Sequence, residues 1–209
     1  PNPAMFNALR VKPNAWWITD KGAKPMARPI AKDYEFKRDH ILNSAAMLFA
    51  REGFAGASMA ELAHECQISK ANIYHYYASK DDILFDVLDG YLGGLMKRIC
   101  GLDLSGFEPK DQFRKCVQEI FLAYQGADNE HRLQSTGIAH LAPEQQGILL
   151  GHQRALVGHL ASIVCPILPK EIQTDKARLR AVTMSIFGML NWFYMWNQNA
   201  DEIARRNYA

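Results

Sequence analysis

Three helix-capping signals within about two dozen residues constrain the fold of this chain most strongly. The stretch Ser58 to Lys80 reads SMAELAHECQISKANIYHYYASK. Ser58 with Glu61 three positions later is the pattern of a capping box, in which a hydroxyl and a carboxylate satisfy free N–H groups at a helix start. Ser69 and Ser79 are placed as two further N-caps. One long helix has no room for three caps, so the stretch is predicted to form a helix-turn-helix followed by the start of another helix.

Each of the two short helices has one apolar face. Met59, Leu62 and Ala63 recur at helical spacing in the first helix. The turn is predicted at Gln67-Ile68, and Ile73 is the inward anchor of the second helix. The rest of that second helix carries Lys70, Asn72, Tyr74, His75, Tyr76 and Tyr77.

The remaining chain shows apolar residues at helical spacing, without the alternation typical of strands. Helices are predicted over about 33–52, 80–100, 110–125, 129–141, 144–168 and 174–197, with a last helix beginning at Asp201. The helix 174–197 is the most apolar, but Thr183, Ser185 and Asn191 interrupt it, and a membrane span needs about 20 apolar residues. The chain is therefore predicted to be all-α, without a membrane partner.

The amino-acid composition limits the size, charge and cellular compartment that can be inferred for the protein. With 209 residues, 48% hydrophobic and 22% charged, the chain can build a substantial core in one or two domains. The net charge of +2 argues neither for nor against a polyanionic partner. The cysteines, at positions 66, 100, 116 and 165, form no C-x-x-C pair, so reduced core thiols are favoured over disulfides. Reduced thiols indicate a cytoplasmic protein.

No metal or cofactor is predicted. His64 and Cys66 are two residues apart on a helix and so point to different faces. The chain also lacks the G-x-S-x-G, Walker, G-x-G-x-x-G and H-E-x-x-H motifs, so it is not expected to be an enzyme.

Residues 1–27 are predicted to form a separate N-terminal segment. They lack clear helical periodicity and a secretory signal, and Met26 is a plausible natural start. We interpret the segment as an expression remnant or an extended reading frame. The alternative is a flexible cationic arm, in which Arg10, Lys12, Lys21 and Lys24 outnumber Asp20.

The block from Ile41 to Leu84 resembles the TetR family of bacterial one-component repressors. The residues that carry the resemblance are Ala46, Phe49, Gly53 and Phe54, then Ser58-Met59-x-x-Leu62-Ala63, then Ile68-Ser69-Lys70-x-x-Ile73-Tyr74-x-Tyr76-Tyr77-x-Ser79-Lys80-x-x-Ile83-Leu84. One position departs from the pattern, because the family usually has glycine in the turn where this chain has Gln67. A left-handed backbone there costs a non-glycine residue on the order of 1 kcal/mol.

The resemblance implies a two-part, all-α protein. Residues 28–80 are expected to form a three-helix, helix-turn-helix DNA-binding domain, and residues 81–209 a larger helical effector-binding and dimerisation domain. The implied partners are a double-stranded DNA operator, a small-molecule effector and a second copy of the chain. In the implied homodimer, the last two helices of each protomer form a four-helix interface. The helix 174–197 has two apolar stripes, which this interface explains as one for its own core and one for its twin. The first stripe is Val182, Ile186, Met189, Phe193 and Trp196, and the second is Ala181, Met184, Gly188, Trp192 and Met195.

The expected DNA contacts follow from what a major groove requires. A recognition helix presents its first turn to base edges and its flanks to phosphates. Lys70 can reach guanine acceptors, Asn72 can pair with adenine, and Ala71 is small enough to approach a thymine methyl group. The expected backbone contacts, partly by resemblance, are Arg28, Lys32, Lys37, Ser58, Tyr74, His75 and Lys80. Tyr77 is instead expected to pack inside the domain.

The effector pocket is expected among aromatic, methionine and polar residues of the central helices. The candidates are Phe85, Met96, Phe113, Phe121, Tyr124, Gln125, His131, His140, Met184, Phe187, Asn191 and Trp192. For each apolar candidate, ordinary core packing is the alternative interpretation.

The expected effector is small and hydrophobic, or a coenzyme A thioester such as phenylacetyl-CoA or a fatty acyl-CoA. MARPIAKDYEFKR, YHYYASKDDILFDVLD and GMLNWFYMW together resemble regulators that respond to such thioesters, those of phenylacetate catabolism above all. Lys97, Arg98, Arg154 and Arg178 are candidates for nucleotide phosphates, or are solvated surface charges. The alternatives are a regulator of an efflux or other catabolic operon that senses a free hydrophobic or aromatic compound, and a non-specific DNA-binding protein. No residue distinguishes repression from activation.

Overall fold

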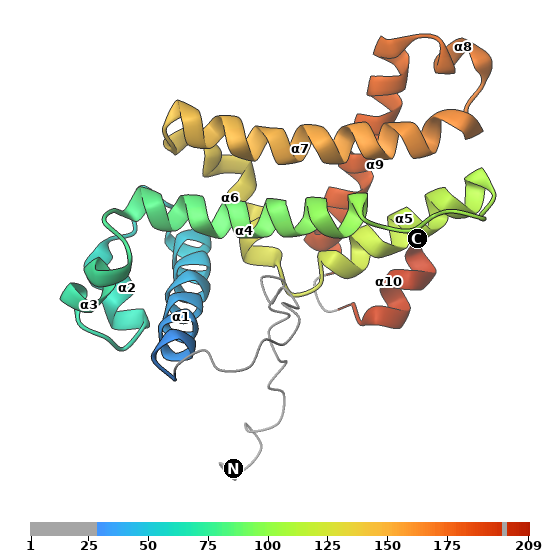
Figure 1. The fold of residues 1–209 in the computed structure, drawn as a ribbon. Helices are drawn as coiled ribbons and strands as arrows, with labels where there is room; N and C mark the ends of the chain where they lie inside the picture. The colour runs from blue at the N-terminus through green and yellow to red at the C-terminus, as the bar shows by residue number, and fades with distance from the viewer. Residues whose placement is uncertain (1–28, 198–199) are drawn as a thin grey trace.

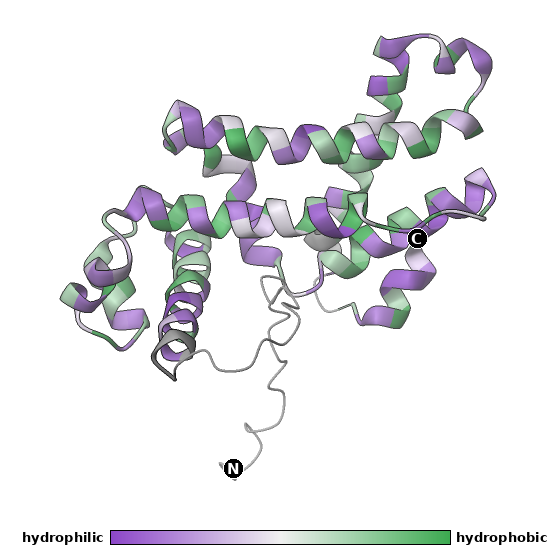
Figure 2. Cartoon of the chain, in the orientation of Figure 1, coloured by the Kyte–Doolittle hydropathy of each residue, from purple (hydrophilic) through white to green (hydrophobic). Residues whose placement is uncertain are grey.

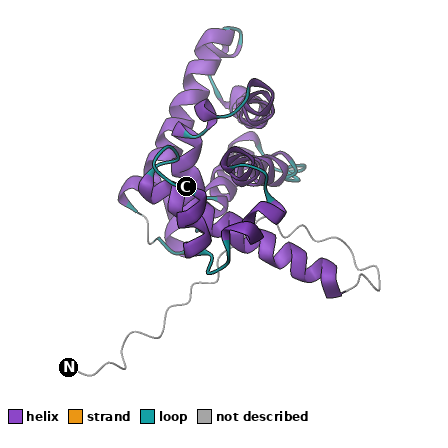
Figure 3. Ribbon diagram, turned by 90° about the vertical axis from the view of Figure 1, so that its left-hand side faces the viewer, coloured by secondary structure: helices purple, strands orange, loops and turns teal. Residues whose placement is uncertain are grey.

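The computed structural model describes residues 29–197 and 200–209, and every regular element in these ranges is a helix (Figures 1 and 3). The α-helices are α1 (Pro29–Glu52), α2 (Met59–Glu65), α3 (Lys70–Tyr76), α4 (Lys80–Cys100), α5 (Pro109–Ala123), α6 (Asp128–Thr136), α7 (Pro143–Val164), α8 (Lys170–Gln173), α9 (Lys176–Trp196) and α10 (Glu202–Tyr208). Two 3-10 turns, η2 (Ile138–His140) and η3 (Cys165–Ile167), follow α6 and α7. The predicted all-α class is confirmed. Arg28 and the predicted segment 1–27 lie outside the described residues.

Helix boundaries differ from the prediction mainly where short helices follow one another. The predicted helix 129–141 is split into α6 and η2, and the predicted start at residue 174 is wrong. A separate one-turn helix, α8, precedes α9, and Thr174 closes that turn by donating its hydroxyl to the carbonyl of Lys170 at 3.0 Å. Asp175 then caps α9 by accepting the N–H groups of Ala177 and Arg178.

The most extensive helix–helix contact of the fold is between α4 and α7. Helices α4 and α7 run side by side, while α1 crosses below and packs against α4 and α6 (Figure 1). On the other side α9 packs against α7, and α10 packs against α5. Polar and apolar residues alternate along the helices of this assembly, as expected for amphipathic helices that each bury one stripe (Figure 2).

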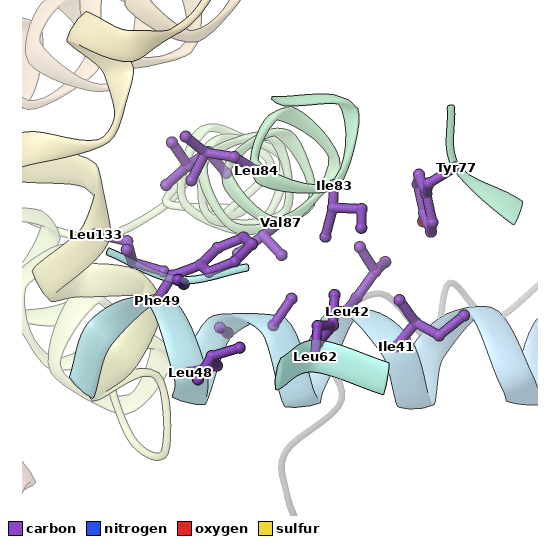
Figure 4. Packing of buried hydrophobic residues seen from close by; sticks show 14 of the residues in the cluster. Ile41, Leu42, Leu48, Phe49, Leu62, Tyr77, Ile83, Leu84, Val87 and Leu133 are labelled. Carbon is purple, nitrogen blue, oxygen red and sulfur yellow. The ribbon is translucent and has the colours of Figure 1, made fainter. Parts of the chain in front are cut away.

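One hydrophobic core joins the first four helices to α6. Ile41 and Phe49 of α1, Leu62 of α2 and Ile73 of α3 are almost completely buried in it. Figure 4 shows Phe49 beside Leu133, which comes from α6. The Arg132 guanidinium of the same helix donates to the carbonyl of Ala50 at 3.4 Å. The helix-turn-helix is therefore packed against the rest of the protein. The predicted division at residue 80 between a DNA-binding domain and an effector-binding domain remains a proposal.

A second core holds α5, α7, α9 and the end of the chain together. Phe121 of α5 and Phe193 of α9 lie 4.7 Å apart, measured between ring centroids. Arg205 of α10 is buried here, and its guanidinium donates to the carbonyls of Ala200 and Phe121. Because these carbonyls and the face of the Phe193 ring surround the cation, α10 is fixed on α5.

The helix Pro143–Ile167, which continues α7 through η3, is the one described helix long and apolar enough to cross a membrane, with a mean hydropathy of 1.3. In this fold it lies against α4, α5 and α9. All four cysteines are free, and Cys66 and Cys116 are buried. Burial raises the pKa of the Cys116 thiol to about 12.

Candidate nucleic-acid interface and effector cavity

All three predicted helix caps are present. The Ser58 hydroxyl accepts the N–H of Glu61 at 3.2 Å, and the Glu61 carboxylate accepts the N–H of Ser58 at 2.7 Å, which completes the capping box. Ser69 and Ser79 accept the N–H groups of Asn72 and Asp82 at 3.1 and 3.0 Å. These caps fix where α2, α3 and α4 begin, and so fix the geometry of the helix-turn-helix.

The turn between α2 and α3 is left-handed at Gln67, where φ is 56°. The N–H of Gln67 bonds to the carbonyl of His64, and the N–H of Ile68 bonds to the carbonyl of Ala63. This pair of bonds is a Schellman motif, whose left-handed position is usually glycine. Gln67 therefore occupies a glycine position, and its side chain makes the turn strained.

Replacement of Gln67 by glycine is expected to raise the free energy of unfolding by about 0.5–1 kcal/mol. Relief of the left-handed strain is worth about 1–2 kcal/mol, and the greater freedom of glycine in the unfolded chain offsets part of it. The midpoint of urea unfolding measures the change. Ala60→Gly in right-handed α2 is the control and is expected to destabilise the protein by about 1 kcal/mol. A lower midpoint for Gln67→Gly would show that strain at this turn is not the dominant effect.

The expected base-reading residues lie together on the open side of α3. Lys70 and Ala71 are exposed and Asn72 is half-buried, while Ile73 points into the core and is completely buried. Tyr74 is also exposed, and the Lys70 ammonium lies 5.8 Å from the centre of its ring. The first turn of α3 is thus open to a partner, as the predicted role requires.

The expected phosphate contacts differ in their surroundings. Ser58 and His75 are exposed. Lys37 is exposed and paired with Asp33 at 2.7 Å. Lys80 instead donates to the carbonyls of Phe54 and Ala57, each at 2.7 Å. The Lys80 ammonium therefore anchors the loop that leads into α2, and its phosphate contact stays a prediction.

A three-residue cluster that sequence reasoning missed fixes the end of α3. The Asp86 carboxylate of α4 accepts the Tyr77 hydroxyl at 2.9 Å and the Arg38 guanidinium of α1 at 2.6 Å. Tyr77 is only 6% exposed, which confirms its predicted packing role. The cluster links α1 and α4 to the end of α3, the helix whose exposed first turn, Lys70, Ala71 and Asn72, forms the expected reading surface.

A cavity of about 410 Å³ lies among α4, α5, α6, α7 and α9. The predicted residues that line it are Tyr124, His131, Met184, Phe187, Asn191 and Trp192. The lining that the prediction missed is Leu92, Leu95, Gln134, Ser135, Gln153, Leu156, Val157 and Gly188. One signal was available, because Gln153 interrupts the buried α7 stripe of Leu149, Leu156 and Leu160. A polar residue on a buried stripe indicates a cavity or a buried partner.

A hydrogen-bonded network forms one wall of this cavity. His131 Nδ1 lies 2.8 Å from the Tyr91 hydroxyl and 3.1 Å from the amide nitrogen of Gln134. The Tyr124 hydroxyl donates to the side-chain oxygen of Asn191 at 2.9 Å. Burial lowers the pKa of His131 to about 4 and raises the pKa of Tyr124 above its usual range. The wall is therefore polar and uncharged at neutral pH.

The other predicted pocket residues lie outside this cavity. Phe85 packs against the first core, Met96 and Phe113 pack against the second, and Phe121 is buried within the second. Gln125 follows the end of α5 and is half-buried. His140 is exposed and contacts the ring of Phe54, with 5.2 Å between ring centroids.

A second hollow adjoins the cavity between α7 and α9, with a volume of about 740 Å³. Arg154, Lys176 and Arg180 line it, and it shares Gln153, Val157 and Met184 with the cavity. Arg154 was among the predicted candidates for phosphate. Of the others, Arg98 pairs with Glu119 and Arg178 pairs with Asp175.

Among the described residues, no group of three or more histidine, cysteine or acidic residues is arranged to hold a metal ion.

Two family models match consecutive parts of the chain. The model for bacterial regulatory proteins of the tetR family matches residues 41–87, and the model for the tetracyclin repressor-like C-terminal domain matches residues 106–206. Together these segments cover more than half of the 209 residues.

Known proteins agree with these matches. The uncharacterised HTH-type regulator YerO of Bacillus subtilis is 33% identical over 87 residues, which are 41% of this chain and 30% of YerO. A TetR-family regulator from Bordetella parapertussis is 29% identical, with a TM-score of 0.77 over 84% of this chain and 92% of its own. AibR, solved in complex with isovaleryl coenzyme A and operator DNA, has the same fold at 20% identity, with a TM-score of 0.68 over 82% of this chain and 95% of AibR.

The chain spans about 30% of the length of curated relatives such as YerO. Residues 41–87, which the tetR-family model matches, contain the three caps and Lys70, Ala71 and Asn72 of α3. Because both family models match in order along one chain, and the fold is shared with the Bordetella protein, this chain belongs to the TetR family of bacterial regulatory proteins.

Proposed function

We propose that this protein is a dimeric, ligand-responsive repressor that acts in the cytoplasm, and not an enzyme. Helix α3 of each protomer enters the major groove of a palindromic operator, and an effector in the cavity releases the DNA. The capped α2–turn–α3 unit carries this proposal, because Lys70, Ala71 and Asn72 are presented on a helix whose inner face is anchored by Ile73. A rigid, open first turn is what base-edge contacts require.

The outer face of α9 supports the dimer. Met184, Met189 and Trp192 are 45%, 62% and 63% exposed, which is unusual for large apolar side chains on one helix. Ser185 and Gly188 lie between them and are also exposed. Small residues among large apolar ones let a second helix approach closely. We infer that this face packs against the same face of a second copy, as an isologous interface requires.

The cavity and the adjoining hollow together support a coenzyme A thioester as the effector. The cavity offers a mostly apolar lining with a few amide groups, and the hollow beside it offers Arg154, Lys176 and Arg180. An acyl or aryl group fits the first environment, and phosphates fit the second. AibR, which shares the fold, was solved with isovaleryl coenzyme A. The alternative effector is a free hydrophobic or aromatic compound, which would use the cavity alone.

Footprinting of the protein on its own upstream DNA tests the operator proposal. We expect protection of one palindrome with two half-sites, whereas a non-specific binder would protect DNA without regard to sequence. Lys70→Ala and Asn72→Ala should each cost about 1–3 kcal/mol and relax base preference at particular positions. Tyr74→Phe is the matched control and should weaken binding to all DNA sequences alike. If both alanine variants leave the footprint unchanged, α3 does not read the bases.

The same DNA complex tests the effector proposal. Thermal unfolding is measured with phenylacetyl-CoA, octanoyl-CoA and free coenzyme A, and DNA release is measured with each compound. A thioester should raise the unfolding temperature and release the operator, while free coenzyme A should do neither at the same concentration. Release by a free aromatic compound, with no effect of any thioester, would favour the alternative effector.

A further inference from the structure

We propose that the cavity accepts only the uncharged part of an effector, so that the protein binds the ester, thioester or amide of an acid and excludes the free acid. The inference rests on the proposed function and deepens it by naming the chemical form of the effector. Its basis is the charge of the cavity lining, which the resemblance to the family does not specify.

Within the described part of the chain, no residue that lines the cavity carries a full charge. The polar lining residues are Tyr124, His131, Gln134, Ser135, Gln153 and Asn191, and the rest of the lining is apolar. A carboxylate moved from water into such a site loses its hydration without gaining a cation. A carbonyl group, in contrast, needs only one or two N–H donors, which amide side chains supply.

His131 does not supply the missing positive charge. The amide nitrogen of Gln134 can only donate, so His131 Nδ1 accepts, and the ring proton of the neutral imidazole lies on Nε2. The Tyr91 hydroxyl points at the same Nδ1 atom, and the backbone of Asn191 contacts the ring as well. The two contacts to Nδ1, from α4 and α6, use the imidazole in its neutral form. Burial is the largest influence on the pKa of His131 and lowers it, against the smaller opposing effect of the Asn191 backbone.

The amide groups of the cavity are suited to a neutral carbonyl. The Asn191 side-chain oxygen already accepts the Tyr124 hydroxyl, so the group that Asn191 can offer a ligand is its N–H₂ donor. Gln153 offers a second amide from α7. An N–H donor binds a thioester or amide carbonyl without any change of charge.

The cations of this region lie next to the cavity and not in it. Arg154, Lys176 and Arg180 line only the neighbouring hollow, while Gln153 lines both spaces. An effector whose anionic portion is separated from its acyl or aryl group by a linker can therefore place that portion in the hollow and its neutral portion in the cavity. A carboxylate bonded directly to the acyl group, or a sulfonate on the ring itself, has no such linker and would have to enter the cavity with its charge. Gln153 stands at the junction, and we infer that the absence of a charge at this position keeps the cavity selective for uncharged groups.

Two fluorescent dyes that differ by one sulfonate group test this assignment. N-phenylnaphthylamine is neutral, and anilinonaphthalene sulfonate has the same ring system with one negative charge. Fluorescence titration of the full chain, without DNA, gives both affinities. We expect the neutral dye to bind at least tenfold more tightly than the anionic dye. The neutral dye should also displace whatever anionic dye occupies the cavity.

Gln153→Arg should place a guanidinium at the junction and reduce the preference for the neutral dye at least tenfold. Gln153→Met removes the amide without adding charge and should leave the preference for the neutral dye in place. Ala155→Arg adds the same charge at a neighbouring exposed position and should also leave it in place.

Equal binding of both dyes to the unaltered protein, or no binding of the neutral dye, would overturn the inference. An unchanged preference in Gln153→Arg would overturn the assignment of Gln153. Because no DNA is present, either result leaves the operator proposal standing. A failed footprint, in turn, leaves the dye preference unaffected.

Discussion

Asp86→Ala is expected to lower the free energy of unfolding by about 3 kcal/mol and to weaken operator binding. The Asp86 carboxylate accepts two hydrogen bonds, from Arg38 on α1 and from Tyr77 at the end of α3. Hydrogen bonds that involve a charged group contribute about 1.5–3 kcal/mol each, and an unpaired buried donor adds a desolvation cost. The Tyr77 side chain has almost no contact with solvent, so its hydroxyl cannot exchange Asp86 for water.

The effect on DNA binding follows from the position of the cluster. Tyr77 is the residue at which α3 ends, and Arg38 belongs to the helix that packs behind α2 and α4. Loss of Asp86 therefore releases the recognition helix from two neighbours while Lys70 and Asn72 remain intact. Operator affinity should fall without a change in base preference, which separates this variant from those of the reading surface.

Urea unfolding and a double-mutant cycle measure the contribution of each bond. Tyr77→Phe removes one hydrogen bond and should cost about 1–2 kcal/mol, and in the Asp86→Ala background it should cost much less. Asp81→Ala is the control, because Asp81 is an exposed acid on the same helix. A cost for Asp86→Ala no greater than that for Asp81→Ala would show that the cluster contributes little.

Features that depend on neighbouring residues were predictable from the sequence. The three caps, the turn at Gln67 and the inward position of Ile73 were all expected and are all present. Each of these depends on residues within a few positions of one another, so local propensity and hydrogen bonding determine it. The left-handed turn was expected to cost free energy, and its φ angle agrees with that expectation.

The cavity was only partly predictable, because its walls come from helices far apart in the chain. Phe121 and Tyr124 are aromatic residues of the same helical stretch and both belong to the second core, yet only Tyr124 also lines the cavity. Phe121 packs against Phe193 of α9 and Tyr208 of α10, whereas the Tyr124 hydroxyl donates to the Asn191 side chain of α9. Asp86 was missed for a similar reason, since its partner Arg38 lies 48 positions away. A single sequence shows that such residues are polar or aromatic, but not which residues they meet.

The pKa of His131 predicts how the stability of the protein depends on pH. Burial lowers this pKa to about 4 in the folded protein, against about 6.5 for an unperturbed histidine. As the pH falls, the unfolded chain binds the proton first. The stability that the neutral ring contributes is therefore fully present above about pH 6.5 and is lost as the pH falls to about 4. A shift of this size corresponds to about 3 kcal/mol.

Neighbouring acids work in the opposite direction. Burial raises the pKa values of Asp128 and Glu130, which precede His131 on α6. These carboxyl groups take up protons more readily in the folded protein than in the unfolded chain, so lowering the pH stabilises the fold through them. The pH dependence of the free energy of unfolding, measured on the unaltered protein alone, therefore understates the contribution of His131. A variant that removes only the imidazole is needed.

Comparison of the unaltered protein with His131→Gln isolates that contribution. Glutamine can still accept the Tyr91 hydroxyl but does not titrate, so both proteins share the response of Asp128 and Glu130. The difference in free energy of unfolding between them should change by about 3 kcal/mol, in favour of His131→Gln, as the pH falls from about 7.5 to about 4. A difference that stays constant over this range would mean that His131 titrates in the folded protein as it does in the unfolded chain. The cavity wall would then gain a positive charge near pH 6.5, and its preference for neutral groups would weaken below that pH.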